Sequence, residues 1–506
     1  MAGVLCCALL CSLSTAFGQE RLAANFILKV GPAAVVNPQP NYVMEQPPVP
    51  REHRVRPTID PAAYAAAKAR AARSRVPGAV KPLTAAPASL APTIKTINFN
   101  GHSDSEGSRP PDTHSAIGTT HFVEVTNSHL DMWDRKVQPS PGSLKLVKSV
   151  TLANFFGYNT ETIFDPRVVY DSTYDRWIIV AEALAESTTV QRLFIGISTG
   201  PDPTKPFFIY NFDIDTFDNN DFFDFPQLGI DQDAVLITGN IFPAVGGFSG
   251  ANFLAIAKAR LYNGLGFDVP IFTGLAATLA PPIVLDQNAS TFLIAAPTSG
   301  AAFTKYTATN TSHPEAVALV ASTITVPSFA TPPDARQPGT SDLLDTSDAR
   351  FINASTQNGE DLWQTHTIDV SGFPVPKFYR INTTTNTVKQ SGRYFVSNSS
   401  DDFNASITAN RAGDCFVTYT STNKGAGKQA QVRLSGKLNG ASGISAGPLG
   451  FTSPTFYTPS LDATERWGDY SAVTVDPLNP ANAWLINEKV NSNSAVWGSR
   501  IIRFGN

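Results

Sequence analysis

Acidic and basic side chains recur just before short apolar segments along this 506-residue chain. An arginine at such a place could bind an anionic group through two parallel hydrogen bonds, and an aspartate could give or take a proton. The same aspartates could instead accept backbone N–H groups at turns. The candidate residues are Asp112, His114, Asp165, Arg167, Asp224, Gln227, Asp348, Arg350, Asp402, Arg466, Asp469 and Tyr470.

The elements that must position these residues are β-strands. From residue 94 onward, runs of β-branched and aromatic residues alternate with clusters of Gly, Pro, Asn and Asp, which is the pattern of an all-β fold. A weak internal repeat has seven copies, each with an apolar strand, a tight turn and a second strand. The residues that end the first strand of each copy are Gly118, Asp171, Asp231, Asp286, Asn353, Asn410 and Asp476.

Seven such copies predict a seven-bladed β-propeller over residues 93–506. The last copy offers only three strands, so we expect Ile94–Phe99 to supply its fourth strand and close the ring. Closure would protect sheet edges that an open repeat leaves exposed. In a propeller, the residues before each innermost strand surround one mouth of the channel, which would bring the Asp and Arg side chains together. A pair of β-sandwiches is the alternative, and it explains the repeat less well.

The N-terminal region predicts export followed by a linker. Residues 1–18 are apolar, too short to span a bilayer, and end in Ala16-Phe17-Gly18, as in a cleaved secretory signal. A lipid-modified Cys11 is the rival interpretation. Residues 19–92 are rich in Pro and Ala and locally basic, so we expect a linker with one short helix over 60–75, whose removal leaves the fold intact. Binding of this linker to an anionic surface is the alternative to a purely solvated segment.

Several classes of function are disfavoured by composition and motifs. A net charge of −4 disfavours a nucleic-acid binder. The chain lacks the usual haem, zinc, phosphate-loop and serine-hydrolase motifs, so we expect no cofactor. After the signal only Cys415 remains, in a strand pattern that indicates a buried structural residue. No later segment is apolar for long enough to form a spanning helix.

Two polar clusters could bind metal but have simpler interpretations. The segment from Asp213 to Asp233 is acidic without the spacing of a calcium loop, so we interpret it as a solvated loop, with calcium binding as the alternative. The histidines at 102, 114, 121 and 129 are most simply strand and loop residues.

Four motifs carry a resemblance to a known family. They are Pro111-Asp112-Thr113-His114, Asp165-Pro166-Arg167 with Asp175-Arg176-Trp177, Phe225-Pro226-Gln227-Leu228-Gly229, and Arg466-Trp467-Gly468-Asp469-Tyr470-Ser471. The chain resembles a family of exported bacterial β-propeller proteins with no assigned activity, distantly like the sialidase propellers. The resemblance implies the fold and export, and it implies no catalytic residues.

These observations favour a secreted, monomeric binding module over an enzyme. Its ligand, a carbohydrate or a cell-surface protein, would lie at the mouth of the channel. One alternative is a sialidase-like glycoside hydrolase, in which Arg167, Arg350 and Arg466 clamp a carboxylate. In that enzyme Tyr470 would be the nucleophile and Asp112 or Asp165 the acid. A structural scaffold of the cell envelope is the third hypothesis. Convergence of the three arginines on one point would favour the enzyme.

Overall fold

The computed structural model describes residues 20–37, 59–76, 81, 91–104, 107–244 and 247–505. The predicted signal, residues 1–18, lies outside them. The regular secondary structure of the described residues is almost entirely β-strand, which confirms the all-β class. Besides α1 (Pro61–Ser74), the helices are the short α2 (Leu152–Phe156) and α3 (Lys258–Leu261).

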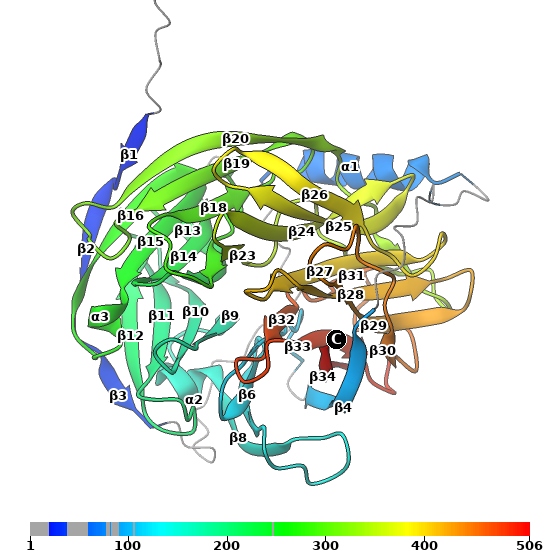
Figure 1. Ribbon diagram of the computed structural model, residues 1–506, viewed down its shortest axis with the longest axis horizontal. Helices are drawn as coiled ribbons and strands as arrows, with labels where there is room; N and C mark the ends of the chain where they lie inside the picture. The colour runs from blue at the N-terminus through cyan, green and yellow to red at the C-terminus, as the bar shows by residue number, and fades with distance from the viewer. Residues whose placement is uncertain are drawn as a thin grey trace, which may run out of the picture.

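Strands that follow one another in the sequence pair antiparallel, and they form successive groups along the chain (Figure 1). The first groups are β5 (His114–Ile117), β6 (His121–Val125), β7 (His129–Asp134) and β8 (Lys145–Thr151); β9 (Ile163–Asp171), β10 (Arg176–Ser187), β11 (Val190–Ser198) and β12 (Phe207–Asp213); and β13 (Phe222–Ile230), β14 (Ala234–Phe242), β15 (Gly250–Ala257) and β16 (Phe267–Leu275).

The later groups follow the same plan. They are β18 (Thr291–Ala295), β19 (Gly300–Thr309) and β20 (Ala318–Phe329); β23 (Ser355–Asn358), β24 (Asp361–Val370), β25 (Phe373–Asn382) and β26 (Thr387–Arg393); β27 (Asp401–Ala409), β28 (Cys415–Asn423), β29 (Lys428–Lys437) and β30 (Leu449–Thr452); and β32 (Ala472–Val475), β33 (Asn482–Val490) and β34 (Trp497–Gly505). A small separate sheet joins β21 (Ala335–Arg336), β22 (Leu343–Leu344) and β31 (Thr464–Glu465).

Both faces of the inner strands of the sheets are buried, so the core lies between neighbouring groups. All residues from Trp177 to Ala183 of β10 are buried, for example, although strand side chains alternate between two faces. One core cluster joins the β9–β12 group to the β13–β16 group, and a second joins the β5–β8 group to the other face of β9–β12. This explains why the strand sequences are continuously apolar and do not alternate.

The innermost strands contact one another in a closed ring. The order is β5, β9, β13, β17 (Pro282–Val284), β23, β27, β32 and again β5. In Figure 1 the groups follow one another around the molecule in chain order. The ring brings the starts of these strands, and the candidate residues on them, toward one centre.

β17 departs from the expected repeat. We expected it to pair along β18, but it runs parallel between β13 and β23, and only Ala280 forms a bridge to β18. Pro281 and Pro282 lack the N–H groups of a regular ladder. Gly229 on β13 accommodates the close approach, because a Cβ there would lie 2.5 Å from the carbonyl oxygen of Pro282.

The segment that includes Ile94–Phe99 forms β4 (Thr93–Ser103), which pairs antiparallel with β34 as the fourth strand of the β32–β34 sheet. Phe99 is 9% exposed and packs edge-on against Trp133 of β7, with ring centres 5.0 Å apart. The first strand of the region from residue 93 thus lies beside the last strand of the chain.

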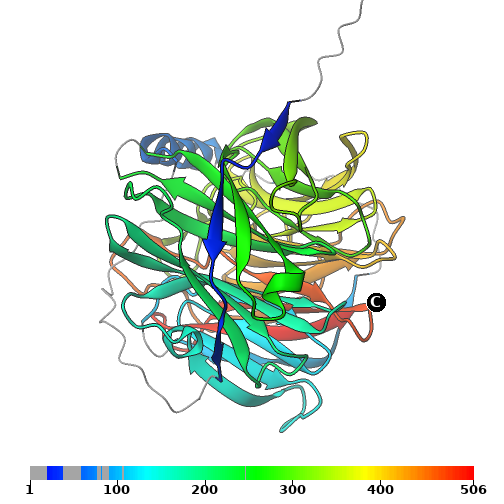
Figure 2. The ribbon, with the colours of Figure 1, turned by 90° about the vertical axis from the view of Figure 1, so that its left-hand side faces the viewer.

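The described parts of the basic N-terminal segment pack against the sheets, unlike the solvated linker that we expected. β1 (Arg21–Ala23), β2 (Phe26–Val30) and β3 (Ala34–Val36) pair with the outer strands β20, β16 and β12. Figure 2 shows this dark-blue segment running along the outer edges of successive sheets. Few apolar residues suffice here, because the segment gains backbone hydrogen bonds from existing edges.

Helix α1 and Lys81 also contact the sheets, and they do so through charge. Asp60 caps α1 by accepting the N–H of Ala63 at 2.9 Å. Lys68 of α1 lies 2.7 Å from Asp334, and the Lys81 ammonium lies 2.7 Å from Asp402 with neither side chain exposed. No helix among the described residues has the length and apolar character needed to cross a membrane.

Candidate functional site

A repeated irregularity in the innermost strands shapes the centre of the ring. Asp165 in β9, Phe225 in β13 and Asn404 in β27 all have positive φ angles, of 52°, 61° and 46°. Each lies where the pairing of its strand shifts register, as in a β-bulge. Such bulges redirect the side chains that follow. The sequence repeat therefore drifts by a residue or two at this position.

Hydrogen bonds from the preceding group hold these strained residues. The N–H of Asp165 donates to Asn127 Oδ1 at 2.7 Å, and that of Phe225 donates to Glu182 Oε1 at 3.2 Å. The N–H of Asn404 donates to a threonine of β24 in the same way. A left-handed backbone in a non-glycine residue is unfavourable, so the contacts between groups must compensate.

Arg167 links several elements across the centre. Its Nε donates to the Pro226 carbonyl at 3.0 Å, Nη1 to Asn353 Oδ1 at 2.9 Å and Nη2 to the Ile352 carbonyl at 3.0 Å. The guanidinium carbon lies 3.2 Å from the centre of the Tyr470 ring. Arg167 is 1% exposed, so its donors are directed at the protein itself.

Three carboxylates meet beside this arginine. Asp165, Glu182 and Asp224 each place an oxygen within 4.8 Å of the others, the only such group of three metal-ligand types among the described residues. The Tyr470 hydroxyl donates to Asp165 Oδ2 at 2.5 Å. The Tyr470 ring packs edge-on against Phe225, with centres 5.0 Å apart. The three carboxylates could accept hydrogen bonds from a polar ligand, bind a cation or exchange a proton.

Burial changes the acid–base properties of the cluster. Desolvation, followed by the charge of Asp224, raises the pKa of Asp165 to about 7, although the Tyr470 hydrogen bond opposes the rise. Burial and the Asp165 charge raise the pKa of Tyr470 well above its usual value. Asp165 is therefore a carboxyl group that keeps its proton close to neutral pH, and Tyr470 is a neutral donor.

Asp112, Asp469 and Arg466 extend the cluster on one side. The N–H of Asp469 donates to Asp112 Oδ1 at 2.7 Å, and Arg466 binds Asp469 at 2.6 Å and Asp345 at 2.9 Å. Burial, with the charges of Asp469 and Asp165, raises the pKa of Asp112 well above its usual value. Candidates from distant copies of the repeat are thus brought together.

Other candidates have separate partners. Arg350 pairs with Asp348 at 2.7 Å, and Nη1 of Arg350 donates to Thr278. His114 accepts the N–H of Val168, and burial followed by the Arg167 charge lowers its pKa well below the usual value.

Gln227 donates to the Phe351 carbonyl, and Asp402 binds Lys81. The three arginines proposed as a clamp bind different acceptors and do not present one shared anion site.

Sequence reasoning missed the buried glutamates on the second strands. Glu124, Glu182 and Glu488 lie within the apolar strands β6, β10 and β33, and each is at most 1% exposed. Each accepts a backbone N–H, from His102, Phe225 and Gly468 respectively. A glutamate inside an otherwise apolar strand was a visible signal, because such a residue is rarely buried without a partner.

The acidic segment from Asp213 to Asp233 is not the fully solvated loop that we expected, because Asp215, Asp224 and Asp231 are at most 7% exposed and Asp224 belongs to the carboxyl cluster described above. Asp215 accepts the N–H groups of Asn219 and Asn220, and Asp231 accepts those of Asp233 and Ala234. Cys415 is fully buried, and burial raises the pKa of its thiol to about 12, which fits the structural role expected.

Of the four histidines noted in the sequence, His102 and His129 lie close together. The rings of His102 and His129 stack with centres 4.5 Å apart, and His102 Nδ1 lies 2.9 Å from Asp131.

Comparisons with known proteins give slight likenesses. No family model and no curated protein matches the chain. An exo-β-1,3-galactanase from Phanerochaete chrysosporium aligns over 82% of this chain and 96% of its own, with 10% identity and a TM-score of 0.31. The parainfluenza virus 5 hemagglutinin-neuraminidase aligns over 73% and 93%, with 14% identity and a TM-score of 0.36. Scores this low assign neither fold nor function, so the assignment depends on the geometry of the site.

Proposed function

We propose that this protein is an exported, seven-bladed β-propeller that hydrolyses a glycoside at the carboxyl cluster of Asp165, Glu182 and Asp224. The closed ring of inner strands and the pairing of β4 with β34 support the blade count and the closure. The apolar residues 1–18 support export.

The observation that carries the proposal is a buried carboxyl group with a raised pKa, Asp165, that lies beside the carboxyl group of Asp224. Asp165 keeps its proton because it is buried beside the charge of Asp224. A carboxyl group whose pKa is raised close to neutral pH is suited to act as a general acid. One oxygen of Asp165 lies within 4.8 Å of one oxygen of Asp224, so the two groups are closer together than the roughly 6.5–9.5 Å that inverting glycosidases need to hold a water between their carboxyl groups.

The proposed reaction has two steps. Asp165 donates its proton to the glycosidic oxygen while the Asp224 carboxylate attacks the anomeric carbon, which forms a glycosyl ester and releases the first sugar alcohol. Asp165 then removes a proton from water, and the oxygen of that water displaces Asp224 and restores both groups. Glu182 positions the bulge of β13, because its Oε1 accepts the N–H of Phe225.

The sialidase-like arrangement has less support. Tyr470 donates its hydroxyl proton to Asp165, and its raised pKa makes it a poor nucleophile. Arg167 and Arg350 are at most 2% exposed, and their donors already have protein acceptors.

A second candidate function is sugar binding without turnover. It is favoured by the burial of the cluster, because Asp165 and Asp224 are only 8% and 7% exposed. In this case the carboxyl groups accept hydrogen bonds from sugar hydroxyls and no bond is cleaved.

The test is a screen of aryl glycosides and oligosaccharides for both binding and turnover. We expect wild-type protein to release sugar with retention of configuration. Asp165→Asn should reduce kcat/KM by about 10²–10⁴-fold, the usual contribution of a general acid. Asp218→Asn is the matched control, because Asp218 is an exposed aspartate whose φ angle is positive, like that of Asp165.

The outcomes separate the candidates. If the protein binds a sugar without turnover and Asp165→Asn weakens that binding, the function is sugar binding and not hydrolysis. Turnover that Asp165→Asn leaves unchanged would place the reaction elsewhere and contradict the proposal.

A further inference from the structure

Lys489 of β33 is a buried ammonium group, and the part of the chain that the structure describes gives it no carboxylate partner. It is 3% exposed, and among the described residues the only hydrogen-bond acceptor of its Nζ is Asn491 Oδ1. A buried cation normally has a counter-charge, because loss of hydration is costly. Burial, with the nearby charge of Arg500, lowers the pKa of Lys489 to about 8, so the group still carries a proton at pH 7.

The lysine lines a cavity of about 550 Å³ between β4, β30 and the turn that follows β33. The lining contains no Asp or Glu among its described residues. Asn100 and Asn493 line it as well; their side-chain oxygens accept hydrogen bonds from Arg500 and Ala495, so their amide NH2 groups remain as donors. The lining therefore carries ammonium and amide donors and no carboxylate among its described residues.

Two neighbours, Gly498 and Phe451, lie close to this ammonium. Gly498 faces it, and a Cβ there would lie 3.0 Å from Lys489 Nζ. Phe451 lies between two cations, with Lys489 Nζ 5.4 Å and the Arg500 guanidinium carbon 4.7 Å from its ring centre. A ligand would thus meet one apolar ring with a cation on either side of it.

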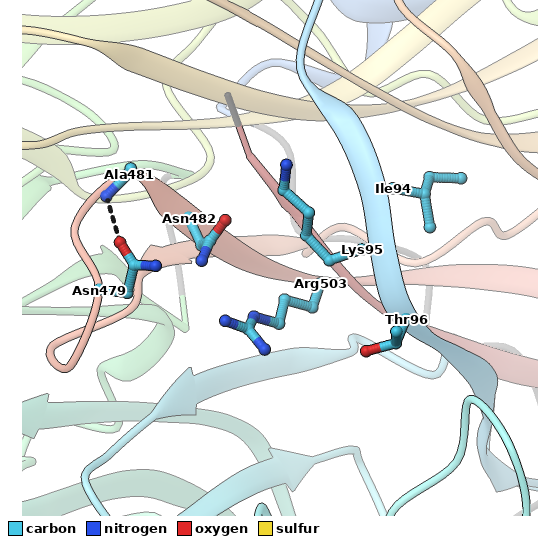
Figure 3. A pocket seen from close by; sticks show the side chains of 7 residues that line it. All are labelled: Ile94, Lys95, Thr96, Asn479, Ala481, Asn482 and Arg503. Carbon is cyan, nitrogen blue, oxygen red and sulfur yellow. Dashed lines mark hydrogen bonds between the residues drawn. The ribbon is translucent and has the colours of Figure 1, made fainter.

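The cavity at the other end of β4 is different. Figure 3 shows Lys95 and Arg503 beside this space of about 600 Å³. Arg503 Nε lies 4.0 Å from Asp476, which also binds Arg135 at 2.8 Å. Arg503 thus has a nearby counter-charge, whereas Lys489 has none in the described residues.

We propose that the cavity around Lys489 binds an oxyanion, as a free anion or as the acidic group of a sugar. The Lys489 ammonium supplies the charge, and the amides of Asn100 and Asn493 supply further donors. Phe451 contacts the apolar part of the carrier. The site shares no residue with the carboxyl cluster around Asp165, so each proposal can fail alone.

Calorimetric titration of the full chain at pH 7 tests this site with sodium sulfate, sodium phosphate, sodium glucuronate and neutral glucose. We expect at least one anion to bind, glucose not to bind here, and Lys489→Met to weaken anion binding by at least tenfold. Tighter binding of glucuronate identifies an acidic sugar as the source, and equal binding identifies the free oxyanion. Lys305→Met is the matched control, since Lys305 is also buried with a pKa lowered to about 8 and lies outside this cavity.

A second measurement needs no variant. The 15N resonance of the Lys489 side chain should titrate at higher pH when the anion is bound, because an opposite charge favours the protonated form. Failure of every anion to bind, or an unchanged Lys489 titration in the presence of bound anion, would overturn the proposal.

Discussion

At the scale of single residues, the centre of the ring combines backbone strain with buried charge. Asp165 has a positive φ, keeps a proton close to neutral pH and accepts the Tyr470 hydroxyl. Arg167 stacks on Tyr470 and bonds to the segment before β23. The strain and the raised pKa therefore occur in the same residue, which is common at functional sites.

The protonation of Asp165 predicts a pH-dependent stability. The folded state holds this proton up to about pH 7, whereas an unfolded aspartate releases it near its usual pKa of about 4. Between pH 4 and pH 7, Asp165 binds a proton when the chain folds. The free energy of unfolding therefore falls as the pH rises through this range. The free energy of unfolding, measured by urea titration, should decrease between pH 5 and pH 8. The decrease should be larger for wild type than for Asp165→Asn, by at least about 1.4 kcal/mol. Equal losses would mean that Asp165 is ionised throughout.

Tyr470→Phe removes the hydroxyl donor of a buried carboxyl group. We expect a loss of about 1–3 kcal/mol in the free energy of unfolding, measured by denaturant titration. Tyr174→Phe, at a more exposed tyrosine, should change stability by less than about 0.5 kcal/mol. A stabilised Tyr470→Phe variant would contradict the hydrogen bond.

At the scale of elements, strand patterns could be predicted but edge contacts could not. Apolar runs such as Trp177–Ala183 fix strands locally, and the terminal strand at Ile94–Phe99 completes a copy that lacks a strand. The pairing of β1–β3 depends on which outer edges remain open, and a three-residue strand leaves almost no local signal. The bulges at Asp165 and Phe225 were equally hidden, because contacts between groups stabilise them.

Lys81 should stabilise the fold although it lies in the basic N-terminal segment. Its ammonium binds Asp402, Ser400 and the Ser397 carbonyl. Lys81→Met would leave a buried aspartate without its cation, which costs about 3–5 kcal/mol. Thermal and denaturant unfolding would measure the loss, with exposed Lys428→Met as the control. A change below about 1 kcal/mol would show that the segment does not stay docked.

At the scale of the whole molecule, the ring and its closing strand should determine whether the protein folds. A chain that begins at residue 91 retains β4 but loses β1–β3, α1 and Lys81. We expect it to fold with reduced stability. A chain that begins at residue 107 also loses β4 and should aggregate, because β34 becomes an open edge. Equal unfolding midpoints and equal solubility of the two chains would rule out closure by β4.

The central claim is that Asp165 acts as an acid on a glycoside at the centre of the ring. Its most direct test is the pH dependence of kcat/KM for a cleaved glycoside. A general acid must be protonated, so we predict that wild-type kcat/KM falls as pH rises through about 7. In Asp165→Asn that fall should be absent and the remaining rate low. A wild-type profile that is flat between pH 5 and 9, or the same fall in Asp165→Asn, would contradict the claim.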